Sequence, residues 1–254
     1  MSGVSVRVVD VDRDLVLLTE GPDVVRRTAS VAKVLVLSAL AAALDDGRVA
    51  DDEVLRRDTT PRVADSGLWH RMAVDALPVR DVALLVAAVS DNWANNVLVE
   101  RLGLDAVNGL AADRRLEHTR LHDVVRDERA PEDPPTLSSG TAREWTTVMA
   151  DLHRGAWVSP SVSRQVLDWL AAGTDHSLVA AAFERDPLVV DALVVTKTGT
   201  DERVRCDVGL VRGPARTLAY AALGNGAPGE LVPRLRRIGQ QVRDLAWGAD
   251  VVTA

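Results

Sequence analysis

Hydrophobic residues follow two different periods along this chain. Near both ends, valine and leucine alternate with polar residues, whereas the middle holds apolar runs of helical length. The alternation predicts β-strands over the following ranges: 4–10, 14–19, 192–198, 205–212 and 216–223. The apolar runs predict helices over the following ranges, with a further short helix beginning near Leu104: 31–44, 78–89, 93–102, 141–153, 160–171 and 231–247.

The order of these elements predicts the architecture. Because the strands occur at the two ends of the chain, we expect them to form one antiparallel sheet, with an all-helical lobe inserted into it. The expected sheet lobe comprises residues 1–28 and 180–254, the expected helical lobe comprises residues 29–179, and the two form one integral unit. Residues 126–140 hold three prolines and many charges, so we expect a long loop there, and long loops in compact domains are often functional.

Composition excludes several classes of protein. The net charge of −7, with a single Phe and a single Tyr, argues against a nucleic-acid-binding surface. No apolar run is long enough to span a bilayer, and the N-terminus lacks a basic segment followed by an apolar one, so we expect a cytoplasmic protein with no membrane partner. Cys206 is the only cysteine, which excludes a multi-cysteine metal site, and we expect neither a metal nor a cofactor.

Lysine occurs only twice, against 28 arginines, and both lysines lie in short motifs with hydroxyl residues. Lys33 follows Ser30 by three residues, and Lys197 directly precedes Thr198. A guanidinium is effectively always protonated, whereas an ammonium can lose its proton when it is buried. A GC-rich genome explains the excess of arginine. The positions of the two lysines nevertheless predict proton chemistry.

Three motifs carry this chemistry. At the start of a helix, Ser30 and Lys33 share a face, so the amine can activate the hydroxyl as a nucleophile. Ser90-Asp91-Asn92 lies between two expected helices, where a hydroxyl can relay a proton; the alternative is a helix N-cap. The third motif is Lys197-Thr198-Gly199-Thr200, at the end of an expected strand, where Gly199 lets a backbone approach closely; the alternative is an ordinary edge strand.

Together and in this order, the motifs resemble those of the class A serine β-lactamases and the related penicillin-binding proteins. The 60-residue separation of Ser30 and Ser90 fits class A, as do Val79, Arg80 and Asp81 before Ser90. The resemblance covers essentially the whole chain. It implies an α+β fold, an α/β three-layer sandwich in which helices flank the antiparallel sheet, beside the helical lobe, with the active site between them.

The resemblance also implies catalytic roles. Ser30 would be the acylated nucleophile and Lys33 would accept its proton, while Ser90 would relay a proton to the leaving nitrogen. Lys197 would set the local potential and help to hold a substrate carboxylate. The backbone N–H groups of Ser30 and Thr200 would form an oxyanion hole.

Further residues would bind substrate. Asn92 would hold its amide, and Thr198 and Gly199 would contribute to the carboxylate site. Arg205 is the nearest match to an arginine that often supports this carboxylate in the family, and a surface arginine is the alternative. Trp69 falls where the family places an aromatic residue at the lip of the site, and a buried tryptophan is the alternative.

The chain departs from the family at the loop that faces the serine. A Glu-x-x-Leu-Asn signature, whose glutamate activates the deacylating water, is absent, and Val125 falls at the glutamate position. Four carboxylates lie nearby: Asp123, Asp127, Glu128 and Glu132. Glu128 is the first candidate for the base, and solvated loop charges are the alternative. Without a positioned base, deacylation is expected to be slow.

These features predict a serine hydrolase that attacks a β-lactam, or a similar amide or ester with a carboxylate, through an acyl-enzyme on Ser30. One alternative is a cytosolic penicillin-binding-like esterase, amidase or acyltransferase. A non-hydrolytic acyl-trapping or ligand-binding protein is the other. Only 29 residues precede Ser30, so the N-terminal helix that normally packs beside the final helix in the family is expected to be missing or very short. We therefore expect 231–247 to expose an apolar stripe and the protein to be a monomer or a weak homodimer.

Overall fold

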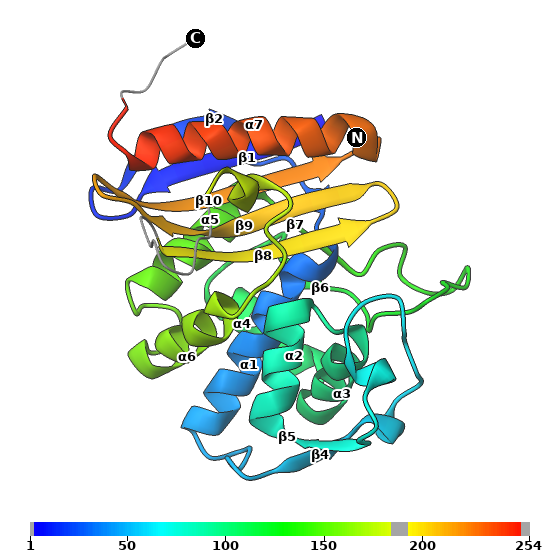
Figure 1. The fold of residues 1–254 in the computed structure, drawn as a ribbon. Helices are drawn as coiled ribbons and strands as arrows, with labels where there is room; N and C mark the ends of the chain where they lie inside the picture. The colour runs from blue at the N-terminus through cyan, green and yellow to red at the C-terminus, as the bar shows by residue number, and fades with distance from the viewer. Residues whose placement is uncertain (1–2, 184–192, 250–254) are drawn as a thin grey trace.

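Strands from both ends of the chain form one antiparallel sheet in the computed structural model, which describes residues 3–183 and 193–249 (Figure 1). The strand order is β2-β1-β10-β9-β8. The strands are β1 (Gly3–Asp10), β2 (Leu15–Glu20), β8 (Leu193–Asp201), β9 (Val204–Arg212) and β10 (Thr217–Asn225). The expected antiparallel sheet is therefore confirmed. Among the residues of the expected strands, only Ala192 lies outside the described ranges.

Helices cover both faces of this sheet, as alternation along β10 shows. Leu218 and Tyr220 belong to the core under α7 (Pro228–Ala246), whereas Ala219 and Ala221 belong to the core that includes α5 (Ala142–His153). Successive side chains of a strand point to opposite faces, so each face needs its own cover. Figure 1 shows α7 above the sheet and the helical lobe below it. The three-layer fold is confirmed.

The expectation that 231–247 exposes an apolar stripe is wrong. The apolar residues of α7 recur at helical spacing and are buried against the sheet: Leu231, Leu235, Ile238, Val242 and Leu245. The sheet face itself gives this stripe a partner. The physical basis for expecting a dimer through α7 is therefore removed.

The helical lobe is built around α1 (Lys33–Asp45), whose residues are apolar nearly all round and almost all buried. Four helices contact it: α2 (Val79–Val89), α3 (Asn92–Leu102), α4 (Leu104–Asp113) and α6 (Pro160–Ala171). One core cluster runs through this lobe and on to the inner face of the sheet. The division at residues 29–179 stays a prediction, although α5, inside that range, packs on the sheet.

Short elements connect these larger ones. The two-residue and three-residue strands are β3 (Arg26–Arg27), β4 (Val54–Arg56), β5 (Ala76–Pro78), β6 (Arg120–Leu121) and β7 (Ser138–Gly140). The short 3-10 helices are η1 (Ala29–Ala32), η2 (Arg57–Thr59), η3 (Trp69–Arg71) and η4 (Val179–Ala182). The expected loop 126–140 thus ends in β7, which pairs with β3 and β6. Within the described ranges, no helix is long and apolar enough to cross a membrane.

Candidate active site

A cleft of about 520 Å³ lies where β8 faces the helical lobe. It is lined by residues from five separate segments of the chain, all of which the fold brings together. The residues of the three sequence motifs that line it are Ser30, Ser90, Asn92, Lys197, Thr198 and Thr200. The structure thus places the three motifs in one cleft.

Ser30 lies in η1, directly before α1, and its backbone turn is held from two sides. Ser138 Oγ donates to the carbonyl of Ala29 at 2.7 Å, and Ala29 itself has a positive φ of 47°. On the other side, a Cβ at Gly199 would collide with the carbonyl oxygen of Thr28. Glycine at position 199 therefore lets β8 approach the nucleophile turn closely.

Lys33 is fully buried and donates to the carbonyl oxygen of Ser90 and to Asn92 Oδ1, both at 2.6 Å. Its Nζ also lies 3.2 Å from Ser90 Oγ. Burial, together with the charge of Lys197, lowers the pKa of Lys33 well below its ordinary value, although Asp91 acts in the opposite direction. The two carbonyl acceptors take both hydrogens of a neutral amine. Its lone pair is then left to accept a hydroxyl proton.

Lys197 approaches Ser90 from the sheet side, with Nζ donating to Ser90 Oγ at 3.0 Å and to the carbonyl of Thr198 at 2.9 Å. Burial lowers its pKa to about 8, against the opposing charges of Asp175 and Asp207. Ser90 adopts the left-handed conformation, with φ 55° and ψ 38°, at the end of α2. Two amines of different lobes therefore converge on a single hydroxyl.

Asp91, the central residue of the second motif, is a structural anchor. Its carboxylate is fully buried and caps α3 by accepting from the N–H of Ala94 at 2.9 Å. It also accepts from the N–H groups of Leu68 and Trp69, each at 2.7 Å. The N-cap alternative is thus correct for this residue, because Asp91 pins a distant loop and starts a helix together.

Two residues expected at the substrate site lie outside the cleft. Trp69 has no exposed surface, and its indole N–H donates to the carbonyl of Val74 at 3.1 Å, so the buried alternative is correct. Arg205 is half-buried and donates to the carbonyls of Val204, at 2.7 Å, and of Asp201, within its own hairpin. Neither side chain is among those that line the cleft.

Two carboxylates that sequence reasoning missed line the cleft and accept hydrogen bonds from motif residues. Asn92 Nδ2 donates to Asp65, and Thr198 Oγ1 donates to Asp175 Oδ2 at 2.7 Å. Neither aspartate belongs to a motif. No pattern along the chain singles them out, because each meets its partner across more than twenty residues of sequence.

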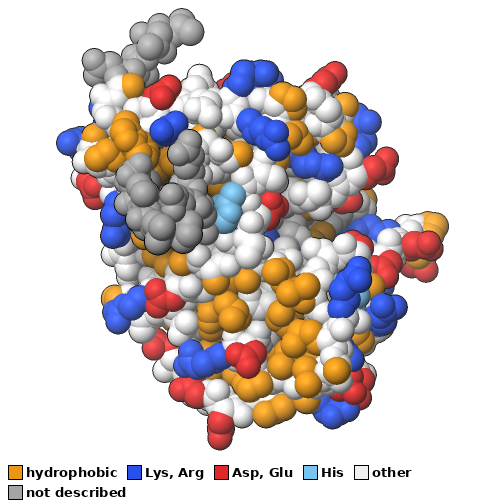
Figure 2. All heavy atoms as spheres, in the orientation of Figure 1, with side chains coloured by type: hydrophobic (Ala, Val, Ile, Leu, Met, Phe, Trp, Pro, Cys, Tyr) orange, Lys and Arg blue, Asp and Glu red, His pale blue; other side chains and the backbone are white. Residues whose placement is uncertain are grey.

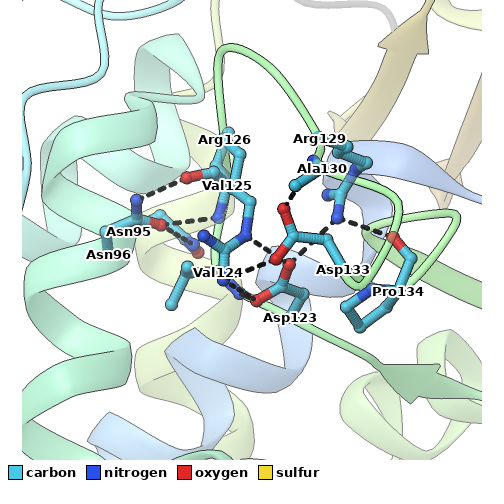
Figure 3. A network of polar contacts seen from close by, with 10 residues as sticks. All are labelled: Asn95, Asn96, Asp123, Val124, Val125, Arg126, Arg129, Ala130, Asp133 and Pro134. Atoms are coloured by element: carbon cyan, nitrogen blue, oxygen red, sulfur yellow. Dashed lines mark hydrogen bonds and ion pairs between the residues drawn. The ribbon is translucent and has the colours of Figure 1, made fainter.

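The loop that follows β6 is held without any glutamate among the residues of its polar network (Figure 3). Asn96 clamps the backbone of Val125: its Nδ2 donates to the Val125 carbonyl at 2.7 Å, and its Oδ1 accepts from the Val125 N–H at 2.8 Å. The Val125 side chain is buried. An apolar side chain therefore stands where the resemblance expects the base.

The carboxylates of this loop are engaged elsewhere or face outward. Asp123 is buried and accepts from Arg126 at 2.7 Å and from Arg129 at 3.0 Å, as Figure 3 shows. Burial opposes ionisation, but the hydrogen bonds from Arg126 and Val124 outweigh it and lower the pKa of Asp123. Glu128 is exposed and does not line the cleft, so the solvated-charge alternative describes its position.

Comparison with known proteins agrees with this fold. A sequence model described as the beta-lactamase enzyme family matches residues 2–245. Beta-lactamase 1 of Streptomyces cacaoi is 27% identical over 191 residues, which are 70% of this chain but only 58% of that protein, less than two thirds of its length. The beta-lactamase structure of Sphaerobacter thermophilus DSM 20745 has a TM-score of 0.83 at 23% identity, over 96% of this chain and 92% of that chain. A mutant of PBP-A, solved as an acyl-enzyme complex with penicillin G, has a TM-score of 0.81 at 24% identity, over 96% and 89% of the two chains.

Proposed function

Since the chain belongs to the beta-lactamase enzyme family, we propose that it is a serine hydrolase that attacks a β-lactam, or a similar ester or amide, through an acyl-enzyme on Ser30. One observation carries this proposal. Lys33 and Lys197 converge on Ser90 Oγ, at 3.2 Å and 3.0 Å, in the cleft that Ser30 lines.

Acylation follows from the different states of the two amines. Neutral Lys33 accepts the hydroxyl proton of Ser30, and Oγ attacks the carbonyl carbon. The N–H groups of Ser30 and Thr200 hold the oxyanion. Ser90 then gives its proton to the leaving atom, and an adjacent amine, Lys33 or Lys197, restores it. The hydrogen bonds of Ser90 Oγ to both lysines support this relay.

Deacylation lacks an evident base, and this feature favours a second candidate function. Val125 has no proton-accepting group, and Asp123 is paired with two arginines. An acyl-enzyme without a positioned base hydrolyses slowly. The protein would then hold its acyl group, as a penicillin-binding protein does, or transfer it to an acceptor other than water.

Intact mass spectrometry resolved in time tests both functions. The protein is mixed separately with penicillin G and with an uncharged phenylacetyl thioester, and Ser30→Ala serves as the control. An adduct that appears on the wild type and then disappears indicates hydrolysis, and a persistent adduct indicates acyl trapping. Absence of any adduct from both reagents, or an equal adduct on Ser30→Ala, would refute the acyl-enzyme.

A further inference from the structure

The cleft is acidic. Four carboxylates are among its lining residues: Asp65, Asp175, Asp201 and Glu202. Lys197 is the one cationic side chain among the described residues that line it. Figure 2 shows acidic side chains at the edge of the hollow between the sheet and the helical lobe. An anionic ligand entering this cleft therefore meets mostly charges of its own sign.

Asp175 occupies the place in which a substrate carboxylate is expected. The resemblance assigns that carboxylate to Lys197 and Thr198, yet Thr198 Oγ1 already donates to Asp175 Oδ2 at 2.7 Å. The other oxygen, Oδ1, accepts from the N–H of Ser177 at 3.1 Å. The negative charge of Asp175 also acts on Lys197, whose pKa it raises. Both expected carboxylate ligands thus interact with a carboxylate of the protein.

Asp175 carries its charge at neutral pH. Burial alone would raise the pKa of Asp175, but hydrogen bonds from Thr198 and Ser177, together with the charge of Lys197, outweigh burial and lower it. Arg205, the expected second cation, donates to carbonyls of its own hairpin and does not line the cleft. A second carboxylate beside Thr198 would therefore lie against Asp175, and Lys197, the one cation among the described residues that line the cleft, already interacts with Asp175.

We propose that Asp175 is a specificity-determining residue that excludes a carboxylate from the leaving-group side of the cleft, so that the preferred substrates are esters, thioesters or amides whose leaving group is cationic or uncharged. This inference rests on the proposed function and names its substrate class. It reverses the expectation of a substrate carboxylate. In the acylation step the bond from Ser30 Oγ to the carbonyl carbon forms, the bond from that carbon to the leaving atom breaks, and the hydroxyl proton ends on the leaving group.

Three thioesters of one acyl group isolate the charge of the leaving group. Near the leaving sulfur, the phenylacetyl thioester of thioglycolate carries a carboxylate, that of thioglycolamide carries no charge, and that of thiocholine carries a cation. For the wild type, we expect kcat/KM for thiol release to be at least ~10-fold higher for thiocholine than for thioglycolate, since like charges at close range oppose binding. Asp175→Asn keeps an acceptor for Thr198, and it should raise the thioglycolate value and lower the thiocholine value, reversing the order.

Asp168→Asn is the matched control, because it removes the same charge from an exposed position on α6 that does not line the cleft. It should leave the order of the three thioesters unchanged. A wild-type preference for thioglycolate, or the same order in Asp175→Asn and wild type, would overturn the inference while leaving the acyl-enzyme intact.

Binding to Ser30→Ala, measured by calorimetry with the same three thioesters, separates this inference from the proposed function. If Ser30→Ala binds the three thioesters in the expected charge order but the wild type is not acylated, the acyl-enzyme is refuted and the role of Asp175 is supported. If the wild type is acylated but binding does not follow the charge order, the acyl-enzyme is supported and the role of Asp175 is refuted. Neither acylation nor the charge order would refute both.

Discussion

Lys33 and Lys197 share a hydrogen-bond partner, Ser90 Oγ, but their surroundings give them different protonation. Lys33 has two carbonyl acceptors, and its pKa is lowered well below the ordinary value by burial and by Lys197. Lys197, with a pKa of about 8, keeps its proton at neutral pH because Asp175 and Asp207 oppose the effect of burial. At the scale of single residues, therefore, the surroundings favour loss of the proton from Lys33, the proposed base, more strongly than from Lys197.

Removal of the base should slow acylation selectively. Lys33→Ala removes the proposed proton acceptor of Ser30, so acylation by the uncharged thioester should fall by roughly 10²- to 10⁴-fold. The measurement is the pre-steady-state rate of adduct formation, with the circular dichroism spectrum as a check of folding. A wild-type rate in a folded Lys33→Ala protein would exclude Lys33 as the base.

The same pair predicts a pH profile. The acylation rate should fall toward acid pH as Lys33 becomes protonated, and it should fall again above about pH 8 as Lys197 loses its proton. Asp207 raises the pKa of Lys197, so Asp207→Asn should move the alkaline limb to lower pH. The uncharged thioester serves as the substrate because it does not titrate. A rate that stays constant from pH 7 to pH 10 would contradict the assignment.

At the scale of elements, the loop that follows β6 is fixed from two directions. Asn96 on α3 holds the backbone of Val125, and Arg126 and Arg129 hold Asp123 (Figure 3). These polar contacts hold the backbone at position 125 in addition to the packing of the buried Val125 side chain. They should keep the loop in place when that side chain is replaced.

This anchoring makes Val125→Glu a direct test of the missing base. If position 125 faces the acyl-enzyme as the resemblance implies, the new carboxylate should accelerate deacylation by roughly 10²-fold or more. Decay of the Ser30 adduct is followed by intact mass, and Val125→Gln controls for side-chain size. Equal decay of the two folded variants would show that position 125 does not face the acyl group.

At the scale of the whole molecule, Asp207 joins three strands of the sheet to η4, and one of these strands, β8, lines the cleft. Its buried carboxylate on β9 accepts from Tyr220 on β10 at 2.9 Å, from Thr196 on β8, and from the N–H of Val179 in η4 at 2.8 Å. Burial raises its pKa to about 6 despite these hydrogen bonds. The protein thus maintains a costly buried charge next to the strand that carries Lys197.

Asp207 predicts a pH-dependent difference in stability. Between about pH 4 and pH 6 the unfolded chain releases the Asp207 proton before the folded chain does, so the wild type loses stability as the pH rises. Asp207→Asn lacks this loss, and its amide can satisfy the same partners. Its free energy of unfolding relative to wild type should therefore increase by about 2 kcal/mol from pH 4 to pH 7.5. Urea unfolding at the two pH values measures this, and a difference independent of pH would contradict it.

Local patterns in the sequence were enough to predict the sheet, most helices and the main reacting residues. The alternation of the terminal strands and the apolar runs between them specify the sheet and most helices, because side-chain periodicity follows backbone geometry. The spacing of Ser30 and Lys33 likewise follows from a single helical turn, and the absence of a carboxylate at Val125 can be read directly. These predictions needed no knowledge of distant contacts.

Only the tertiary structure decided which side chains face the cleft. Trp69 is buried because Asp91 pins its loop from another segment, and Arg205 donates to carbonyls of its own hairpin. Asp175 reaches Thr198 across 23 residues of sequence. Such contacts depend on the packing of separate elements, which no local period or spacing encodes. The sequence therefore specified the reacting groups, whereas the fold specified the charges that surround them.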